Sequence, residues 1–302
     1  MTTTSKTMPR IDLPLFKRGK VRDTYDLGDG TLLMVASDRI SAFDVVLPTE
    51  IPDKGAVLTQ MSRWWFERTS SIVPNHLVPD NPHSLPNGVD WDAVALRSMR
   101  TVLAQRIDIE CVVRGYLSGS GWKEYRDSGT LAEEPLPPGL SESSRLPEPR
   151  FTPATKSEEG HDVNISRRQL ADSVGVDLAR RLEEISLSLF EYGARQCESA
   201  GLILADTKFE FGFRGDELIL IDEVLTPDSS RFWEMSEWRE GQPAASFDKQ
   251  FVRDHLESVG WNKTPPAPEL PGEVVAGTRD RYLEAARRIC GIDVASMSVD
   301  ER

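Results

Sequence analysis

The pattern of hydrophobic and polar residues changes from strand-like to helical within the first seventy positions. Residues 21–27 and 31–36 are rich in aliphatic, aromatic and β-branched residues, and the Gly-Asp-Gly sequence between them is typical of a tight turn. This arrangement predicts a β-hairpin with Gly19 and Lys20 at the start of its first strand. From 56 to 68 apolar residues recur at intervals of three and four, which predicts a helix.

The second half of the chain contains a long predicted helix and a second predicted hairpin. Ser166 and Gln169 form the pattern of a helix-capping box, and apolar residues recur on one face until Gly201 ends the segment. Two strand-like runs follow at 202–212 and 217–223 and predict the hairpin. Three further segments are predicted to be a strand, an irregular segment and a final helix: 107–113, 74–91 and 279–289.

Residues 135–162 interrupt this order with a stretch rich in Pro, Ser, Glu and Gly. Composition alone indicates a linker or mobile loop there. The sequence contains no internal repeat and no heptad array. The mixture of strands and helices predicts an α+β fold, with two α/β lobes around a central cleft.

Charge and composition narrow the class of protein. The 302 residues carry a formal charge of −13, which argues against binding to nucleic acid or to an anionic membrane surface. No segment approaches the roughly 20 apolar residues of a membrane span, and the N-terminal residues lack the apolar core of a secretory signal. The three cysteines are widely spaced, so we expect no disulfide framework, no zinc site and a reducing cytoplasmic setting. Cys111, within an apolar run, is predicted to be a buried and inert thiol.

The second hairpin carries the most informative group of ionisable residues. Strand alternation places Asp206, Lys208 and Glu210 on one face and the neighbouring aromatic residues on the other. If the turn centres on Gly215, Asp222 returns opposite Lys208. Such carboxylates suit Mg²⁺, which often binds through one or two carboxylates and substrate phosphates. The alternative is an exposed hairpin with cross-strand ion pairs, which contribute little in water.

Four other segments carry side chains or backbone groups that suit an anion. They are 19–23 with Lys20 and Arg22, 37–44 after an apolar strand, 114–121 with Arg114 and several glycines and serines, and 228–231 with Arg231. Positive charge and an unobstructed backbone are what a phosphate requires. Each segment also has an ordinary interpretation as a surface strand, turn or loop. Their occurrence together in an acidic protein favours an anionic ligand.

Six sequence motifs together resemble the SAICAR synthetase family of purine biosynthesis. In chain order they are GKVRD, SDRISAFD, IPDKG, ECVVRGYLSGSG, ADTKFEFG and IDEVLTPDSSRFW, and the matches run from Gly19 to about Asp254. The loop that begins at Glu110 and the segment from Leu204 to Gly212 are the most specific. Ser118 departs slightly from the family pattern, in which Thr or Ala is more usual before Gly-Ser.

The resemblance implies an ATP-dependent ligase that joins L-aspartate to CAIR (carboxyaminoimidazole ribonucleotide) and forms SAICAR, ADP and phosphate. An acyl phosphate on the CAIR carboxylate is the implied intermediate. The implied fold has a first lobe similar to the ATP lobe of protein kinases and a C-terminal helix packed back against both lobes. The implied division is 1–113 for the ATP lobe, 114–266 for the second lobe and 267–302 for the C-terminal helical segment. A monomer or small homo-oligomer in the cytoplasm is expected.

The resemblance also implies roles for individual residues. The ATP site would include Gly19, Lys20, Arg22 and Glu110, and the Mg²⁺ ligands would be Glu210 and Asp222. Catalytic roles would fall to Lys208 and Asp206 beside the reacting carboxylate and to Asp162 as base. Substrate contacts would come from Arg114, Ser120, Arg231, Ser37, Asp38, Arg39, Ser41, Asp44 and Lys156, the last on a loop over the substrates. Two rival interpretations stay open: another kinase or phosphotransferase on the same ATP lobe, and a nucleotide-binding protein without activity.

Overall fold

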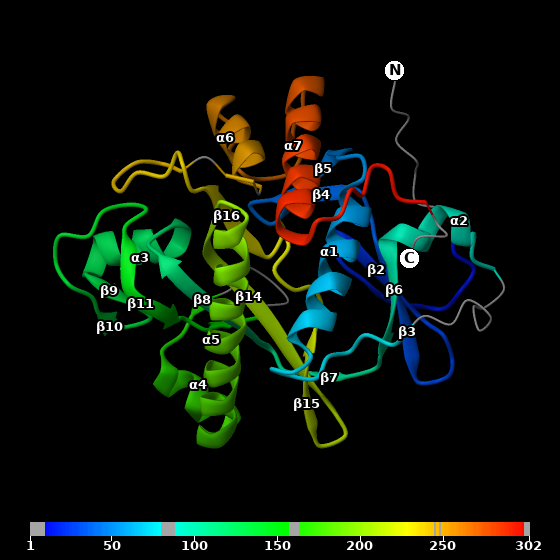
Figure 1. Ribbon diagram of the computed structural model, residues 1–302, viewed down its shortest axis with the longest axis horizontal. Coiled ribbons are helices and arrows are strands. Elements are labelled where there is room, and N and C mark those ends of the chain that lie inside the picture. Colours follow the sequence, from blue (N-terminus) through cyan, green and yellow to red (C-terminus); the bar gives the residue numbers. More distant parts are fainter. Residues whose placement is uncertain (1–9, 80–87, 157–162, 245, 248, 299–302) are drawn as a thin grey trace.

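The computed structural model describes residues 10–79, 88–156, 163–244, 246–247 and 249–298 (Figure 1). The N-terminal sheet has the strand order β1-β2-β3-β6, and all its neighbours are antiparallel. Its strands are β1 (Leu15–Arg18), β2 (Arg22–Asp26), β3 (Thr31–Ala36) and β6 (Ser98–Val102).

The predicted first hairpin is confirmed as β2 and β3, with Arg22 opposite Ala36. Its first strand begins at Arg22, one residue later than predicted. Gly19 and Lys20 lie just before it, in the turn that joins β1 to β2. The Gly19 N–H donates to the Arg22 carbonyl at 2.7 Å, and a Cβ on Gly19 would lie 2.7 Å from that oxygen. This close approach explains why glycine is required at the turn.

A second, eight-stranded sheet contains the predicted second hairpin. Its main path is β13-β12-β8-β14-β15, and β7, β11 and β16 pair with β14 or β8 beside that path. The strands are β7 (Gln105–Arg106), β8 (Ile109–Tyr116), β11 (Arg145–Phe151), β12 (Ala154–Thr155), β13 (Val163–Asn164), β14 (Leu202–Arg214), β15 (Glu217–Ile221) and β16 (Ser230–Glu234). In Figure 1 this sheet lies at the centre and left, and the N-terminal sheet lies at the right.

Two sequence-based expectations are corrected by this sheet. Residues 135–162 are not simply a linker, because β11 and β12 lie within them and both pair with β8. The strand predicted over 107–113 continues to Tyr116, so Arg114 lies in a strand rather than in a loop. The boundary expected between 113 and 114 thus falls inside β8, which belongs wholly to the larger sheet.

The predicted helices are present, and one of them is divided. Helix α1 (Lys54–Thr69) covers the predicted segment at 56–68. The Ser166 capping box is confirmed at the start of α4 (Arg167–Val174), but Gly175, with φ 87°, separates α4 from α5 (Val176–Ser199). The C-terminal helix is α7 (Gly272–Ala285), followed by a short π-helical turn at Ala286–Cys290.

The remaining elements complete the outer parts of the molecule. They are β4 (Arg39–Ala42), β5 (Val45–Glu50), α2 (Trp91–Val94), a 3-10 turn at Ala95–Arg97, α3 (Gly119–Ser128), β9 (Thr130–Leu131), β10 (Glu134–Pro135) and α6 (Gln250–Ser258). Strands β4 and β5 pair with each other, and their apolar side chains pack with those of α6 and α7 in a separate small core. Figure 1 shows α6 and α7 side by side at the top, next to these two strands.

The main hydrophobic core lies between the large sheet and helices α1 and α5. Phe209 and Phe211 of β14 are fully buried there, together with Trp65 of α1 and Leu189 of α5. Burial of large apolar side chains of this kind is the dominant favourable term in folding. It also fixes the orientation of β14, because the residues that alternate with these phenylalanines must point away from the core.

A short segment that follows α1 connects the two sheets. Within residues 74–78, the Pro74 carbonyl accepts from the Leu220 N–H of β15, and the His76 N–H donates to the Leu220 carbonyl. The His76 carbonyl accepts from the Val102 N–H of β6, and the Val78 N–H bonds to the carbonyl of Arg100. We call residues 74–78 the connecting strap.

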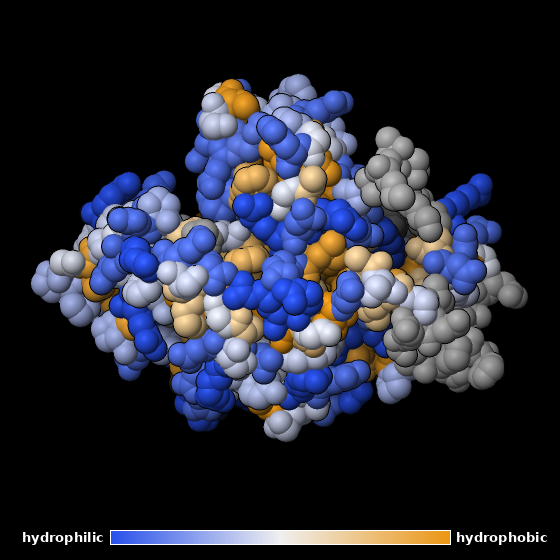
Figure 2. Space-filling view, turned by 45° about the horizontal axis from the view of Figure 1, so that its top comes forward, coloured by the Kyte–Doolittle hydropathy of each residue, from blue (hydrophilic) through white to orange (hydrophobic). Residues whose placement is uncertain are grey.

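The surface and the cysteines agree with the composition. On the face drawn in Figure 2, hydrophilic residues predominate and hydrophobic residues form small separate patches. Among the helices of the described residues, none is both long and apolar enough to cross a membrane. The three thiols are free, and Cys111 is buried as predicted, which raises the pKa of its thiol.

Candidate active site

A cleft of about 1240 Å³ lies between the two sheets. Its walls contain residues from the β1–β2 turn and β2, from β4 and the end of β6, from alternate positions of β8, and from β14, β15 and the segment up to Arg231. Thirteen of the residues expected from the sequence line it: Gly19, Lys20, Arg22, Ser41, Asp44, Glu110, Arg114, Lys156, Asp206, Lys208, Glu210, Asp222 and Arg231. Residues more than two hundred positions apart thus converge on one space.

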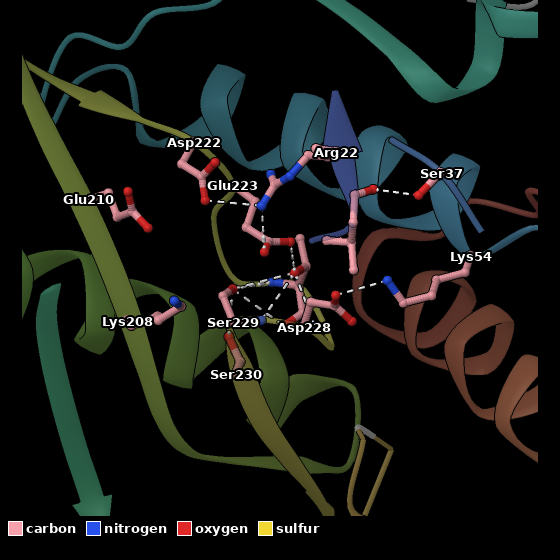
Figure 3. Close-up of polar contacts among 12 residues, drawn as sticks. Arg22, Ser37, Lys54, Lys208, Glu210, Asp222, Glu223, Asp228, Ser229 and Ser230 are labelled. Carbon is pink, nitrogen blue, oxygen red and sulfur yellow. Dashed lines mark hydrogen bonds and ion pairs between the residues drawn. The ribbon is translucent and has the colours of Figure 1, made fainter. Parts of the chain in front are cut away.

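Strand β14 supplies the floor of the cleft. Asp206, Lys208 and Glu210 face the cleft, whereas Phe209 and Phe211 face the core, as strand alternation predicted. In Figure 3 Lys208, Glu210 and Asp222 lie around the same open space.

The position of Asp222 differs from the prediction by one residue. The ladder pairs Arg214 with Glu217 and Glu210 with Ile221, so Asp222 lies one residue beyond the last pair. Its backbone is left-handed, with φ 68°. A non-glycine residue in this region costs free energy and is often found where a side chain must be directed to a function.

Arg22 connects the N-terminal sheet to the end of β15. Its Nη2 lies 3.0 Å from Asp222 Oδ2 and 2.8 Å from Glu223 Oε1. Burial alone would raise the pKa of Asp222, but Arg22, followed by Lys156 and Lys208, lowers it below its ordinary value. Asp222 is therefore an anion at neutral pH.

Glu210 is the second carboxylate at this position. Burial, together with the neighbouring charge of Asp222, raises the pKa of Glu210, while an ion pair with Lys156 opposes that rise. A cation between these two carboxylates would relieve the effect of the Asp222 charge on Glu210. No group of three or more His, Cys, Asp or Glu side chains with metal-site geometry occurs in the described ranges, so the chain itself would offer a cation these two carboxylates.

Lys208 and Glu110 form a second ion pair on the floor of the cleft. Lys208 Nζ lies 2.5 Å from Glu110 Oε1, and the Glu110 side chain is buried. Burial lowers the pKa of Lys208, but Glu110 and then Glu210 raise it above its usual value. Lys208 is therefore a cation at neutral pH.

Asp206 lies beneath two arginines at the other end of β14. Its carboxylate accepts two hydrogen bonds from Arg231 Nη1, at 2.8 and 2.7 Å, and one from Ser118 Oγ at 2.7 Å. Arg114 Nη1 lies 3.4 Å away, and Arg114 Nη2 donates to Ser120 Oγ at 2.9 Å. Burial raises the pKa of Asp206, but the two arginines and Ser118 lower it, so the group stays ionised. Two guanidinium groups and one carboxylate leave a net positive charge, which suits a phosphate.

Gly119 allows this arrangement. Its φ is 52°, and a Cβ on it would lie 2.5 Å from Arg231 Nη2. Ser118, the small departure from the family pattern, contacts Asp206 directly and so provides a hydroxyl donor.

Four residues expected at the site do not line the cleft. Ser37 Oγ donates to the Val21 carbonyl at 2.8 Å and accepts from Arg39 Nε, while Arg39 Nη2 donates to Asp23 at 2.7 Å. The Asp38 carboxylate accepts from the Gly55 N–H at 2.9 Å and from Arg97 Nη2. These three residues support the β4 region from behind. Ser120 meets the cleft only through Arg114.

The β1–β2 turn faces the β4–β5 turn across the mouth of the cleft. Lys20 Nζ lies 2.6 Å from Asp44 Oδ1, and both side chains are about half exposed. Asp44 has a left-handed backbone, with φ 64°. Asp162, expected as the base, lies outside the described residues.

Several buried residues near the site were not predicted. Glu223 binds Arg22 and accepts from Thr226 Oγ1 at 2.6 Å. Asp228 binds Lys54 and Lys249, and its side chain is 2% exposed. Both acids belong to the motif IDEVLTPDSSRFW, in which Glu223 follows Asp222 and Asp228 precedes Arg231. This closeness in sequence to predicted site residues is the signal that could have identified them. No local pattern marks Lys249.

Taken together, the cleft offers the carboxylates of Glu210 and Asp222 in one part, two arginines around Asp206 in another and Lys208 between them. No Ser-His or Cys-His pair suited to nucleophilic catalysis is found among the described cleft residues. The arrangement suits a reaction that needs charge neutralisation and alignment of anions rather than a protein nucleophile.

Comparison with known proteins shows which family this chain is similar to. A family model described as SAICAR synthetase matches residues 15–268. A phosphoribosylaminoimidazole-succinocarboxamide synthase of Thermodesulfovibrio yellowstonii is 52% identical over 275 residues, which cover 90% of this chain and 94% of that protein. The protein of the same name from Desulfosudis oleivorans is 52% identical over 282 residues, covering 92% and 96%.

Solved structures agree with the sequence relatives. A SAICAR synthase from Saccharomyces cerevisiae, complexed with SAICAR, has a TM-score of 0.87 and 42% identity, covering 95% of this chain and 99% of that one. A type-2 SAICAR synthetase in complex with ADP shares the fold, with a TM-score of 0.68, 24% identity and coverage of 92% and 98%. The α+β fold expected from the sequence is therefore confirmed.

Proposed function

The chain belongs to the SAICAR synthetase family, and from this premise we propose how its cleft divides the work of the reaction. The activity is the ATP-dependent joining of L-aspartate to CAIR, which gives SAICAR, ADP and phosphate in purine biosynthesis. The substrates are small molecules. The alternative of a kinase or other phosphotransferase is not favoured, because relatives at about half identity bear the synthase name.

We assign the ATP phosphates to the end of the cleft that holds Gly19, Lys20 and Arg22. The close backbone approach at Gly19 and the two cations support this assignment. Glu110, paired with Lys208, would form part of the same ATP site.

We propose that Glu210 and Asp222 hold Mg²⁺ together with ATP oxygens. Glu210 and Asp222 are adjacent, and burial and the charge of Asp222 raise the pKa of Glu210. Such a pair fits Mg²⁺, which commonly binds through one or two carboxylates and substrate phosphates. Lys156 and Arg22 neutralise them in the protein alone. The ion would supply neutralisation of charge on the phosphate oxygens.

We assign the phosphate of CAIR to Arg114 and Arg231, with Ser120 supporting Arg114 by accepting its hydrogen bond. The net positive charge around buried Asp206 is the single observation that carries this assignment. Asp206 then acts as the counter-ion that fixes both guanidinium groups, and its lowered pKa supports that role rather than proton transfer.

The reaction requires a carboxylate oxygen of CAIR to become a leaving group. We propose that the γ-phosphoryl group of ATP is transferred to that oxygen, breaking the bond to ADP and forming an acyl phosphate. The amine of aspartate then attacks the carbonyl carbon, phosphate leaves, and the amide forms with loss of a proton. Lys208 would stabilise negative charge between the two anion sites.

Aspartate would enter near Ser41 and Asp44, which line the cleft beside the β4–β5 turn. Ser37, Asp38 and Arg39 would shape this region from behind. Asp162 is retained as the proposed base and Lys156 as a residue of the loop over the substrates.

The proposed layout is two lobes with the cleft between them. The N-terminal sheet and α1 would form the lobe similar to the ATP lobe of kinases. Because β7 and β8 pair within the larger sheet, we place the division after β6 rather than at residue 113, with 267–302 as a C-terminal segment. A cytoplasmic monomer or small homo-oligomer completes the proposal, and the three free thiols support a reducing compartment.

An assay with and without L-aspartate tests the function. The protein is incubated with ATP, Mg²⁺ and CAIR, and both ADP and SAICAR are measured. We expect SAICAR and ADP in equal amounts, and only when aspartate is present. ADP release that does not respond to aspartate, without an amide product, would favour the phosphotransferase instead.

A further inference from the structure

A buried ion cluster beside the cleft joins three helical regions to one turn. The Asp228 carboxylate accepts hydrogen bonds from Lys54 Nζ at 2.8 Å and from the Tyr282 hydroxyl at 2.7 Å, and Lys249 Nζ lies 3.0 Å away. Lys54 starts α1, Lys249 immediately precedes α6, and Tyr282 belongs to α7. We call these four residues the Asp228 cluster. Figure 3 shows the bond from Lys54 beside the polar contacts of Glu223 and Ser229.

The turn that carries Asp228 connects groups already assigned to the site. The Asp228 N–H donates to Thr226 Oγ1 at 3.2 Å, and Thr226 Oγ1 donates to Glu223, the partner of Arg22. On the other side, the Ser229 carbonyl accepts from the Lys208 N–H at 3.0 Å, and Arg231 follows two residues later. A displacement of Asp228 would pass through Ser229 to Arg231, whereas Arg22 would keep its direct ion pair with Asp222.

The two oxygens of Asp228 have different partners. Lys54 and Lys249 both contact Oδ2, whereas Tyr282 contacts Oδ1. Among the hydrogen bonds of the described residues, the Tyr282 hydroxyl is the side-chain donor to Oδ1. Its hydroxyl therefore holds the carboxylate from the side opposite the two ammonium groups, and its removal would leave Oδ1 without this donor.

Helix α7 lies beyond the part of the chain that the family model matches, which ends at residue 268. It nevertheless contacts the start of α1 twice. Tyr282 reaches the carboxylate that binds Lys54, and Arg279 Nη2 lies 2.5 Å from Asp53, the residue before Lys54. Tyr282 is 1% exposed, so its ring is part of the main core while its hydroxyl meets the cluster.

We propose that Tyr282 is a positioning residue for the CAIR phosphate site, acting through Asp228 and the turn that leads to Arg231. It touches no substrate. The proposal rests on the assignment of Arg231 to CAIR made above. It gives the C-terminal helix a role in substrate affinity beyond its contribution to the core.

The test is Tyr282→Phe, which removes the hydroxyl and keeps the ring, including the side of the ring that Lys54 Nζ approaches at 5.9 Å. Loss of a hydrogen bond to a buried charge predicts that the KM for CAIR rises about tenfold. The KM for ATP should change less than about twofold, and kcat should fall little, because the contacts of Gly19 and Lys20 do not involve the cluster.

Two controls separate positioning from a general effect on the fold. Thr278→Val removes a buried hydroxyl from the same helix, one that bonds to the Val274 carbonyl within α7. Tyr192→Phe makes the same chemical change on α5, where the ring packs against Trp65. Both should keep the KM for CAIR within about twofold of the wild type, and melting temperatures should be recorded for all three variants.

Three results would overturn the proposal: an unchanged KM for CAIR in Tyr282→Phe, an equal rise in the KM for ATP, or the same rise in Thr278→Val. A melting temperature lowered in Tyr282→Phe with both KM values unchanged would assign the hydroxyl to stability alone and also overturn it. Failure of the wild-type protein to form SAICAR is a different outcome, since it would contradict the proposed function itself.

Discussion

The sequence predicts that Asp222 lies at the site, but it gives the wrong position for this residue in the hairpin. The sequence placed it beside Lys208 and Glu210, and all three do line the cleft. The predicted pairing of the two strands is wrong by one residue, because it takes Gly215 alone as the centre of the turn. The turn contains two residues, Gly215 and Asp216, so each partner shifts by one position. The left-handed backbone at Asp222 then brings its carboxylate to the site, and no sequence pattern reveals that conformation.

Asp222→Asn should abolish turnover while the fold survives. The amide keeps the shape of the side chain but loses the negative charge assigned to Mg²⁺, and Arg22 retains Glu223 as a partner. Loss of one key electrostatic group commonly lowers kcat by about 10²–10³-fold. Steady-state kinetics and circular dichroism check both parts. Asp216→Asn, in the exposed turn of the same hairpin, is the matched control, and a variant at 222 that keeps more than about a tenth of the rate would exclude the metal role.

Gly119→Ala should weaken CAIR binding. The new Cβ would lie 2.5 Å from Arg231 Nη2 and would also impose a left-handed φ on alanine. Gly129→Ala carries a comparable backbone penalty, with φ 73°, but meets no atom within 4 Å. The difference between the two variants therefore isolates the contact with Arg231. We expect the KM for CAIR to rise at least about tenfold more in Gly119→Ala than in Gly129→Ala. In Gly129→Ala the backbone strain of about 1 kcal/mol should lower the stability and leave the KM unchanged. Equal KM values would show that Arg231 does not hold CAIR.

At the scale of elements, local signals identified strands and helix starts but not their limits. The capping box at Ser166 is present as predicted, whereas Gly175 divides the helix although the apolar periodicity continues through it. Residues 135–162 contain Pro147 and Pro149, which suggested a linker. Both lie in β11, which pairs with β8 through an irregular register. Proline is tolerated in such strands at the edge of a sheet or at a bulge, so its presence did not exclude a strand.

The N-terminus of α4 provides an element-scale test. Ser166 Oγ caps the helix by accepting from the Gln169 N–H, and the Gln169 side chain accepts from the Ser166 N–H. Ser166→Ala should lower the free energy of unfolding by about 1 kcal/mol, the usual cost of losing an N-cap. Ser188→Ala, whose hydroxyl bonds back to the Glu184 carbonyl on the exposed side of α5, should change it by less than about 0.5 kcal/mol. Urea denaturation of both variants measures the difference. A loss confined to Ser188→Ala would contradict the capping argument.

At the scale of the whole molecule, sequence reasoning identified the convergence of the motifs but not what holds the C-terminal helix to them. Lys54, Asp228 and Tyr282 are separated by up to 228 positions and carry no shared pattern. A lysine with no exposed side-chain surface is unexpected from composition, because buried charges require a partner that only the tertiary structure reveals. The family resemblance predicted the site residues, whereas only the tertiary structure shows that Tyr282 of α7 contacts Asp228.

Asp228→Asn should destabilise the protein at neutral pH and flatten its response to acid. Burial raises the pKa of Asp228, but Lys249 and Lys54, with hydrogen bonds from Lys54 and Tyr282, lower it well below its ordinary value. The carboxylate therefore stabilises the fold fully above about pH 4, its range in the unfolded chain, and this contribution is lost as pH falls further toward the folded pKa. Removing one partner of a buried ion pair costs about 3–5 kcal/mol.

Denaturant titrations between pH 7 and pH 3 test this expectation. The gap between the wild type and Asp228→Asn should be constant down to about pH 5 and should narrow below about pH 4. Asp216→Asn, with an exposed side chain, should follow the wild type throughout. A gap that widens in acid would show that Asp228 is not ionised in the folded protein.

The connecting strap has a consequence for protein engineering. Residues 74–78 belong to the N-terminal part of the chain, yet their backbone bonds both to β15, at the end of the main path of the larger sheet, and to β6. A fragment that ends after β6 would keep the strap but lose β15, and the complementary fragment would leave the Leu220 amide and carbonyl unsatisfied. The N-terminal sheet is therefore not an interchangeable module. Chimeras between relatives should exchange the strap and β15 together.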